Sequence, residues 1–222
     1  MVRRTTVKYP LRILFTFAAA LLLFQLASAQ VPQLNPFSAD LHINSTRSDR
    51  GPLEVAGQVY VGSGHIRMNM EGSGHKTALL TDFATKTTDI LLIEQQVYIE
   101  QKAGQGPGHG PNSMTEELKP YDPDHPCANQ PNVTCKKIGV EEVSGRSCDH
   151  WEVTDKEGRL TNLWIDQKLH FPVKVVTKDT EMLLTNIRDG EPDPSLFTIP
   201  PAYHKMDLGA MMPQGMQHPP QN

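Results

Sequence analysis

Residues 57–70 read GQVYVGSGHIRMNM, two runs of alternating apolar and polar residues around a Gly-Ser-Gly turn. Successive side chains of a strand point to opposite faces, so alternate residues share a face. The apolar residues of each run therefore lie on one side: Val59 and Val61 in the first run, and Ile66, Met68 and Met70 in the second. Glycines in the turn tolerate the positive φ that a tight hairpin requires. The stretch predicts an antiparallel hairpin with one apolar face.

Similar alternation on both sides of this hairpin predicts about eleven short strands separated by turn residues. The expected strands are residues 37–47, 54–62, 64–71, 76–83, 87–93, 96–101, 136–143, 147–154, 159–166, 172–178 and 181–188. Ile90 and Leu92 continue the apolar pattern in the fifth of them. Tight connections and little helix indicate a mainly β fold, a strongly curved antiparallel sheet or half-barrel. Such a sheet has a concave apolar face that something must cover.

One long interruption divides the expected domain, which covers residues 30–207. From residue 103 to 134 the strand pattern breaks, beginning with a Gly/Pro-rich spacer. Ser113 and Glu116 then form a capping-box pair that predicts a short helix over 114–119. Loops of this length are often lids or binding elements, and disorder is the alternative.

The C-terminal part of the chain changes composition after Asp189. An extended segment follows, whose apolar residues are expected to tuck back onto the sheet: Leu196, Phe197 and Ile199. Residues 208–222 are rich in Pro, Met, Gln and Gly and are expected to be disordered. This end also collects soft-metal donors: Met206, Met211, Met212 and Met216, with His204 and His218. Thioethers suit copper(I), and the alternative is a polar tail that binds no metal.

The first 29 residues have the features of a secretion signal. Four basic residues (Arg3, Arg4, Lys8 and Arg12) accompany an apolar run over 13–24, and small residues predict cleavage between Ala29 and Gln30. The apolar run is too short to span a bilayer comfortably, and no later stretch is apolar for long enough. A periplasmic or secreted protein is expected.

Loss of this signal makes the protein more acidic. The whole chain has 21 basic and 25 acidic residues, and residues 1–29 hold four of the basic ones and none of the acidic ones. The remainder therefore carries a formal charge of −8. Nucleic acids and anionic membrane surfaces attract basic proteins. No nucleic-acid partner is expected, and membrane contact is expected to be peripheral or absent.

The chain contains three cysteines, and an exported protein meets conditions that permit disulfides. Cys127 and Cys135 bracket a loop that can fold back and bring the two thiols together. If residues 144–145 form a hairpin turn, Val143 faces Arg146 and Glu141 faces Cys148, which places Cys148 far along the strand from Cys135. A Cys127–Cys135 disulfide is therefore preferred. The third thiol, Cys148, is then unpaired, buried or intermolecular, and the sequence does not decide among these.

Several stretches together carry a resemblance to a known superfamily. They are residues 57–70, the ladder from Leu79 to Ile93 that ends at Tyr98, NLWIDQKLHFPVK over 162–174, and DPSLFTIPPAY over 193–203. In order and motif they resemble the periplasmic lipoprotein-carrier (LolA-like) superfamily, and more closely its branch of exported domains of unknown function. The likeness covers most of residues 37–204.

This resemblance implies a half-barrel whose concave face holds a hydrophobic ligand or a lipoprotein acyl chain beneath helices that act as a lid. The sequence departs from the typical carrier in two ways. Residues 35–37 lead almost directly into a strand, with no helix before it. The helical lid is reduced to the segment around 113–119.

The alternation itself selects a candidate ligand-binding set on the apolar face. Its members are Val59, Val61, Ile66, Met68, Met70, Ile90, Leu92 and Trp151. Methionine is flexible and adapts to ligands of variable shape, although it fills core gaps equally well. The alternative for every member is ordinary core packing. A structural or sensory envelope protein with a filled core is therefore the second hypothesis.

Sequence motifs of catalysis are missing from the chain. It has no Gly-x-Ser-x-Gly elbow, no phosphate-binding glycine loop before a helix, no His-Glu-x-x-His helix and no Cys-x-x-Cys pair. No catalytic residue, resident metal site or cofactor is therefore assigned, and a non-catalytic role is expected.

Overall fold

The computed structural model describes residues 35–46, 51–102, 125–128 and 132–206. The chain divides into two units, Met1–Gln30 and Val31–Asn222. The predicted signal peptide, the predicted helix over 114–119 and the tail over 208–222 all lie outside the described residues.

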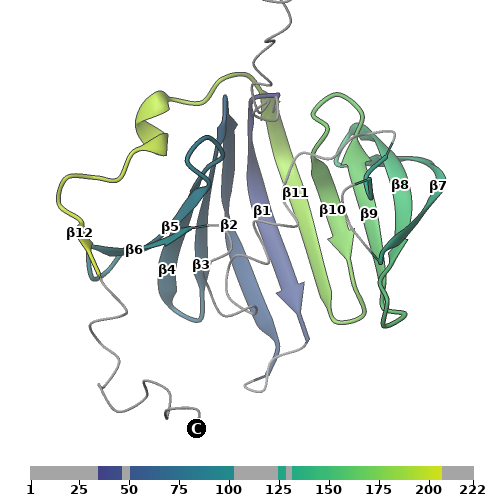
Figure 1. Ribbon diagram of the computed structural model, residues 1–222, viewed down its shortest axis with the longest axis horizontal. Coiled ribbons are helices and arrows are strands. Elements are labelled where there is room, and N and C mark those ends of the chain that lie inside the picture. Colours follow the sequence, from purple (N-terminus) through teal and green to yellow (C-terminus); the bar gives the residue numbers. More distant parts are fainter. Residues whose placement is uncertain (1–34, 47–50, 103–124, 129–131, 207–222) are drawn as a thin grey trace, which may run out of the picture. The chain divides into compact units, whose positions relative to one another are not determined.

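The strands of the described part form a single open sheet of twelve strands, mainly antiparallel (Figure 1). In chain order they are β1 (Phe37–Ser45), β2 (Leu53–Gly62), β3 (His65–Gly72), β4 (His75–Asp82), β5 (Thr87–Leu92), β6 (Val97–Lys102), β7 (Thr134–Val143), β8 (Arg146–Thr154), β9 (Leu160–Asp166), β10 (Pro172–Val176), β11 (Thr180–Asp189) and β12 (His204–Lys205). The order across the sheet is β12-β6-β5-β4-β3-β2-β1-β11-β10-β9-β8-β7. The predicted fold class, a curved open β sheet with little helix, is confirmed.

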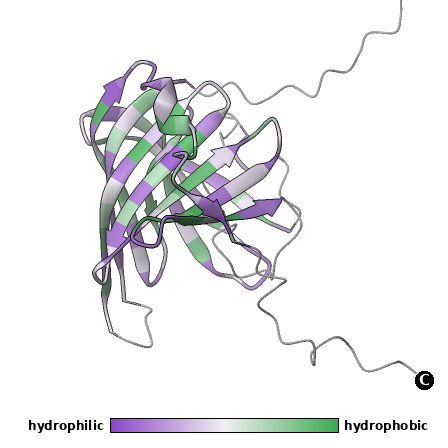
Figure 2. Cartoon of the chain, turned by 90° about the vertical axis from the view of Figure 1, so that its left-hand side faces the viewer, coloured by the Kyte–Doolittle hydropathy of each residue, from purple (hydrophilic) through white to green (hydrophobic). Residues whose placement is uncertain are grey.

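Two meanders make up this sheet. Strands β1 to β6 follow one another in space, and so do β7 to β11. They join where β1 pairs with β11, through contacts that include a 3.0 Å hydrogen bond between the hydroxyls of Ser45 and Thr180. Figure 2 shows the alternation of hydrophobic and hydrophilic residues along the strands, the pattern from which they were predicted.

The predicted strands agree closely with those observed. The predicted β7–β8 register is also confirmed, because Val143 lies opposite Arg146 and Glu141 lies opposite Cys148. The sequence did not predict β12, which pairs in parallel with β6 over only two residues. A two-residue strand is too short to show any periodicity.

The segment after β11 returns to the sheet as expected. Phe197 and Ile199 pack against a buried cluster of Ala78, Leu80 and Leu91 on β4 and β5. The segment was expected to be extended, but Pro194–Phe197 forms one 3-10 turn, named η1. The Asp193 carboxylate accepts a hydrogen bond from the backbone N–H of Ser195, which favours a turn over an extended chain.

The main hydrophobic core combines both meanders. Its fully buried members include Phe37 and Leu41 of β1, Val59 and Val61 of β2, Leu184 of β11, and Phe171 before β10. The rings of Phe37 and Phe171 meet edge to face, with centroids 5.1 Å apart. This contact joins the N-terminal strand to the β9–β10 turn across the seam of the sheet.

A buried carboxylate organises that same turn. Asp166 is 1% exposed, and its Oδ1 accepts hydrogen bonds from the backbone N–H groups of Lys168 and Leu169, both at 2.7 Å. Its Oδ2 accepts from Arg146 Nε at 2.5 Å. Arg146 also donates to Asp189 at the end of β11, over 2.9 Å. One side chain thus connects β8, the β9–β10 turn and, through Arg146, β11.

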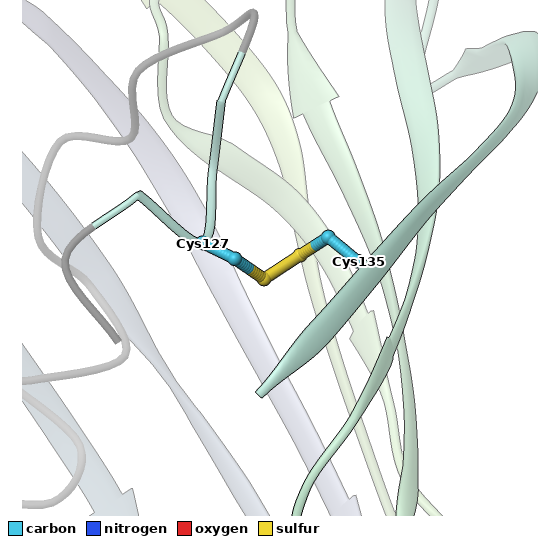
Figure 3. Close-up of a disulfide and its surroundings, with 2 residues drawn as sticks. All are labelled: Cys127 and Cys135. Atoms are coloured by element: carbon cyan, nitrogen blue, oxygen red, sulfur yellow. A yellow bond between two sulfur atoms is a disulfide. The ribbon is translucent and has the colours of Figure 1, made fainter. Parts of the chain in front are cut away.

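The predicted disulfide between Cys127 and Cys135 is present (Figure 3). It fastens the segment before β7 to the beginning of that strand, with the two Cα atoms 6.1 Å apart. The third thiol, Cys148, is unpaired and fully buried. Of the alternatives left open for Cys148, the structure therefore selects a buried free thiol.

Burial raises the pKa of the Cys148 thiol to about 12. The reactive thiolate is therefore scarce at neutral pH, and the surrounding core blocks reagents. We expect N-ethylmaleimide to leave the folded protein unlabelled and to add one label in denaturant, as measured by intact mass. Labelling of the folded protein at the rate of a small free thiol would contradict this placement.

Close backbone approach between β2 and β3 depends on Gly57. A Cβ atom built at this position would lie 1.9 Å from the carbonyl oxygen of Asn69 on β3. Any side chain here collides with backbone, which cannot move aside as a flexible side chain can. The glycine is therefore required by the packing of the two strands.

Candidate functional site

The registers of β2 to β6 bring the predicted ligand-binding residues onto one face. Val59 lies opposite Met68, Met68 opposite Leu79, Leu79 opposite Ile90, and Ile90 opposite Ile99. Val61 and Ile66 form the next pair of the same face, and Met70 and Leu92 both lie opposite Thr77. Seven of the eight predicted residues therefore share the apolar face of β2 to β5. The eighth, Trp151, lies in the second meander, and the registers that run from Ile43 through Met182, Val175 and Leu163 place it on the same side of the sheet.

Burial divides this apolar face into two parts. Val59, Val61, Ile66 and Met68 are buried and belong to the main core cluster. Met70, Ile90 and Leu92 are only half-buried. Their apolar neighbours on the face are half-buried too: Ile43, Val55, Val97 and Ile99. We call the seven residues Ile43, Val55, Met70, Ile90, Leu92, Val97 and Ile99 the half-buried apolar surface.

Trp151 belongs to a different cluster, in the second meander. It is 8% exposed and packs with Leu163, Ile165 and Val175. Met182 contacts both this cluster and the main core, so the two clusters are continuous through β11. The indole N–H of Trp151 is buried and has no hydrogen-bond acceptor among the described residues. A buried N–H of this kind is costly unless an acceptor reaches it.

A cavity of about 530 Å³ shares one residue, Met70, with the half-buried apolar surface, and its lining combines polar and apolar side chains. It is bordered by Asp40, Ala56, Gly57, Gln58, Arg67, Asn69, Met70, Glu71, Lys76, Thr77 and Ile93. Most of these residues alternate with the predicted set and so belong to the opposite face. Of the predicted residues only Met70 borders it. The cavity therefore lies mainly on the face opposite the predicted ligand-binding set, and it is not the cavity expected from the sequence.

Arg67 is the half-buried cation of this cavity. Its Nε donates a hydrogen bond to Asn69 Oδ1 over 2.8 Å, and its Nη1 donates to the carbonyl oxygen of Leu196 over 2.7 Å. Burial lowers the pKa of the guanidinium from its ordinary value. Both acceptors are neutral, and the second bond fastens the segment after β11 to β3. Arg67 alternates with Met68 and so lies on the face opposite the main core, where the segment after β11 partly covers it.

The described residues also bear on metal binding and on membrane insertion. No group of three or more His, Cys, Asp or Glu side chains there is arranged to hold a metal ion. In the same residues no helix combines the length and hydropathy of a membrane-spanning segment. Most of the methionines and histidines proposed as soft-metal donors lie beyond residue 206, outside the described residues.

Structure comparison finds similar solved structures at low sequence identity. An uncharacterised conserved protein from Thermus thermophilus is 10% identical, with a TM-score of 0.52 over 78% of this chain and 90% of that one. A chain of the Pseudomonas aeruginosa MucA/MucB complex is 15% identical, with a TM-score of 0.48 over 78% of this chain and 59% of that one. A LolA superfamily protein from Nitrosomonas europaea is 12% identical, with a TM-score of 0.37 over 75% and 91%.

Sequence comparison gives the family. No curated protein matches the sequence. A family model described as "Domain of unknown function (DUF4412)" matches residues 37–170, which include β1 to β9 and the turn that Asp166 organises. This match covers more than half of the chain, and the chain therefore belongs to the DUF4412 family.

Proposed function

We propose that this protein is an exported, non-catalytic protein of the cell envelope that binds a lipid, an acyl chain or another hydrophobic molecule. The ligand lies on the half-buried apolar surface of β1 to β6. The predicted signal over residues 1–29 supplies the route of export. The net charge of −8 after its removal argues against a nucleic-acid ligand.

One observation carries the proposal: the apolar face is buried at one end and half-buried at the other. Soluble proteins rarely leave a contiguous apolar patch in contact with water unless something binds there. Met70, Ile90 and Leu92 come from two different strands, yet the strand registers place them on one face. Val59 and Met68 lie on the same face as these three residues and are buried, at 0% and 2% exposed.

A structural or sensory role with a filled core is the second candidate. The burial of Val59, Val61, Ile66 and Met68 favours it, because these residues are already packed against their own chain. In that case the half-buried apolar residues are the edge of the hydrophobic core and bind no ligand. A partner protein then binds the outer surface or the Met/His-rich tail.

Native mass spectrometry separates the two candidates. The processed protein is purified from its own envelope without detergent, and its mass is compared before and after organic extraction. Lipid in stoichiometric amount that disappears on extraction supports the binding proposal and gives the ligand class. An apo mass, with no later uptake of a fluorescent fatty acid, overturns it and leaves the second candidate.

Neighbouring residues on β5 and just after it offer a matched pair of variants. Leu92 is on the half-buried apolar surface, while Ile93 packs against the Ala78–Leu91 cluster on the opposite face. Leu92→Gln is expected to weaken fatty-acid binding about tenfold, because it places an amide against the acyl chain. Ile93→Gln is expected to leave affinity within about twofold. Titration with a fluorescent fatty acid measures both, and thermal melting checks the fold of each variant. Equal losses in the two would count against the assigned face.

A further inference from the structure

The two edges of the sheet differ in whether another strand covers the edge strand. At one edge, β12 covers part of β6. At the other, β7 runs for ten residues, and within the described ranges no strand pairs with its outer side. The outer N–H and C=O groups of an edge strand are a template for pairing with another strand.

The centre of β7 is apolar and exposed. Ile138 is 43% exposed and Val140 is 57% exposed, and they flank Gly139. Leu160 is the other large apolar residue with comparable exposure in the described part of the chain. A bulge against β8 leaves Ile138 as the extra residue of β7, so its side chain is not matched by a partner on β8.

Charges on β7 are segregated around this apolar centre. Lys136 and Lys137 precede it, and Glu141 and Glu142 follow it. Two copies of the strand in antiparallel alignment bring the basic half of each against the acidic half of the other. This holds for registers one residue to either side as well, whereas a parallel alignment opposes like charges.

Two of these four charges already have partners within the chain. Lys137 donates to Asp149 over 2.7 Å, and Glu141 accepts from Trp164 Nε1 over 2.8 Å. Lys136 and Glu142 are exposed at the two ends of the segment. They are therefore the charges that a second copy meets first.

We infer that β7 pairs in antiparallel fashion with β7 of a second copy of this chain, around a two-fold axis near Gly139. An isologous contact of this kind uses the same patch twice and closes as a dimer. A single strand pair buries little surface, so the dimer is weak and depends on concentration. This inference is independent of the proposed ligand.

Charge reversal tests the pairing. Lys136→Glu leaves β7 with an excess of acidic residues, and Glu142→Lys leaves it with an excess of basic ones. Each variant alone is expected to dimerise about tenfold more weakly than the native protein, because residues 136 and 142 lie opposite each other in the strand pair and now carry like charges. An equimolar mixture of the two variants is expected to recover association as a heterodimer, which general destabilisation cannot do. Sedimentation velocity across a concentration series measures all three, and circular dichroism checks that each variant is folded.

Cross-linking locates the contact. A Cβ at Gly139 meets no atom within 4 Å, so Gly139→Cys is compatible with the fold, and the new thiol lies beside the axis. A short bismaleimide is expected to convert Gly139→Cys into a covalent dimer. Lys156→Cys, at the exposed tip of the β8–β9 hairpin, is expected to stay monomeric. A native protein that is monomeric up to its solubility limit, or a dimer insensitive to both charge variants, overturns the inference.

Discussion

Replacing Asp166 by alanine is expected to destabilise the protein by about 3–5 kcal/mol. The carboxylate is buried, and it pairs with Arg146 while accepting two backbone N–H groups of the β9–β10 turn. Its loss leaves a half-buried guanidinium without its nearest counter-charge and leaves two turn amides without acceptors. Urea unfolding followed by tryptophan fluorescence gives the change in unfolding free energy.

Asp155 supplies the control for this variant. It accepts hydrogen bonds from the backbone N–H of Glu157 and of Arg159 and pairs with the Arg159 side chain, so its contacts resemble those of Asp166. It lies at an exposed hairpin tip, where water replaces lost partners and screens the charges. Asp155→Ala is expected to have a much smaller effect. Similar losses in both variants would show that burial of Asp166 is not what matters.

Gly57→Ala is expected to cost at least about 3 kcal/mol, the upper range for overpacking, because the added methyl group meets a backbone carbonyl. The overlap is severe, with the new Cβ 1.9 Å from Asn69 O, and relief requires β2 and β3 to separate. Chemical denaturation measures the loss. We also expect a lower yield of folded protein, since β2 and β3 carry the buried part of the apolar face.

Gly139→Ala is the matched control for Gly57→Ala, because Gly139 is also a glycine within a strand. Its Cβ meets nothing within 4 Å, so unfolding free energy is expected to change by less than about 0.5 kcal/mol. A tolerated Gly57→Ala would mean that β2 and β3 can move apart at little cost.

The strands could be predicted because period two is a local property that each run shows by itself. Val59, Met68 and Ile90 alternate within their own strands, and antiparallel hairpins then bring them to one face. The β7–β8 register followed in the same way from the turn at 144–145. The predicted disulfide needed only that two nearby cysteines bracket a loop.

Contacts between distant parts of the chain could not be predicted from local pattern. The hydrogen bond from Arg67 to Leu196 joins residues 129 positions apart, and no periodicity within either segment predicts it. The cavity beside it depends on how β2, β3 and β4 curve relative to one another, which alternation does not fix. For Met70, Ile90 and Leu92, the pattern gave the face but not the degree of burial, so their role in binding stays a prediction.

The pairing of β1 with β11 has a consequence for the order in which the chain acquires its structure. Ser45 and Thr180 touch across this seam although 135 residues separate them. Contacts between such distant residues form late, because closing a long loop costs entropy before the contact repays it. Each meander can form its hairpins early, but the middle of the sheet waits for residues 180–189. For the export proposed above, this order means that the central strand pair forms only after residues 180–189 have crossed the membrane, so that most of the chain crosses before the sheet is complete.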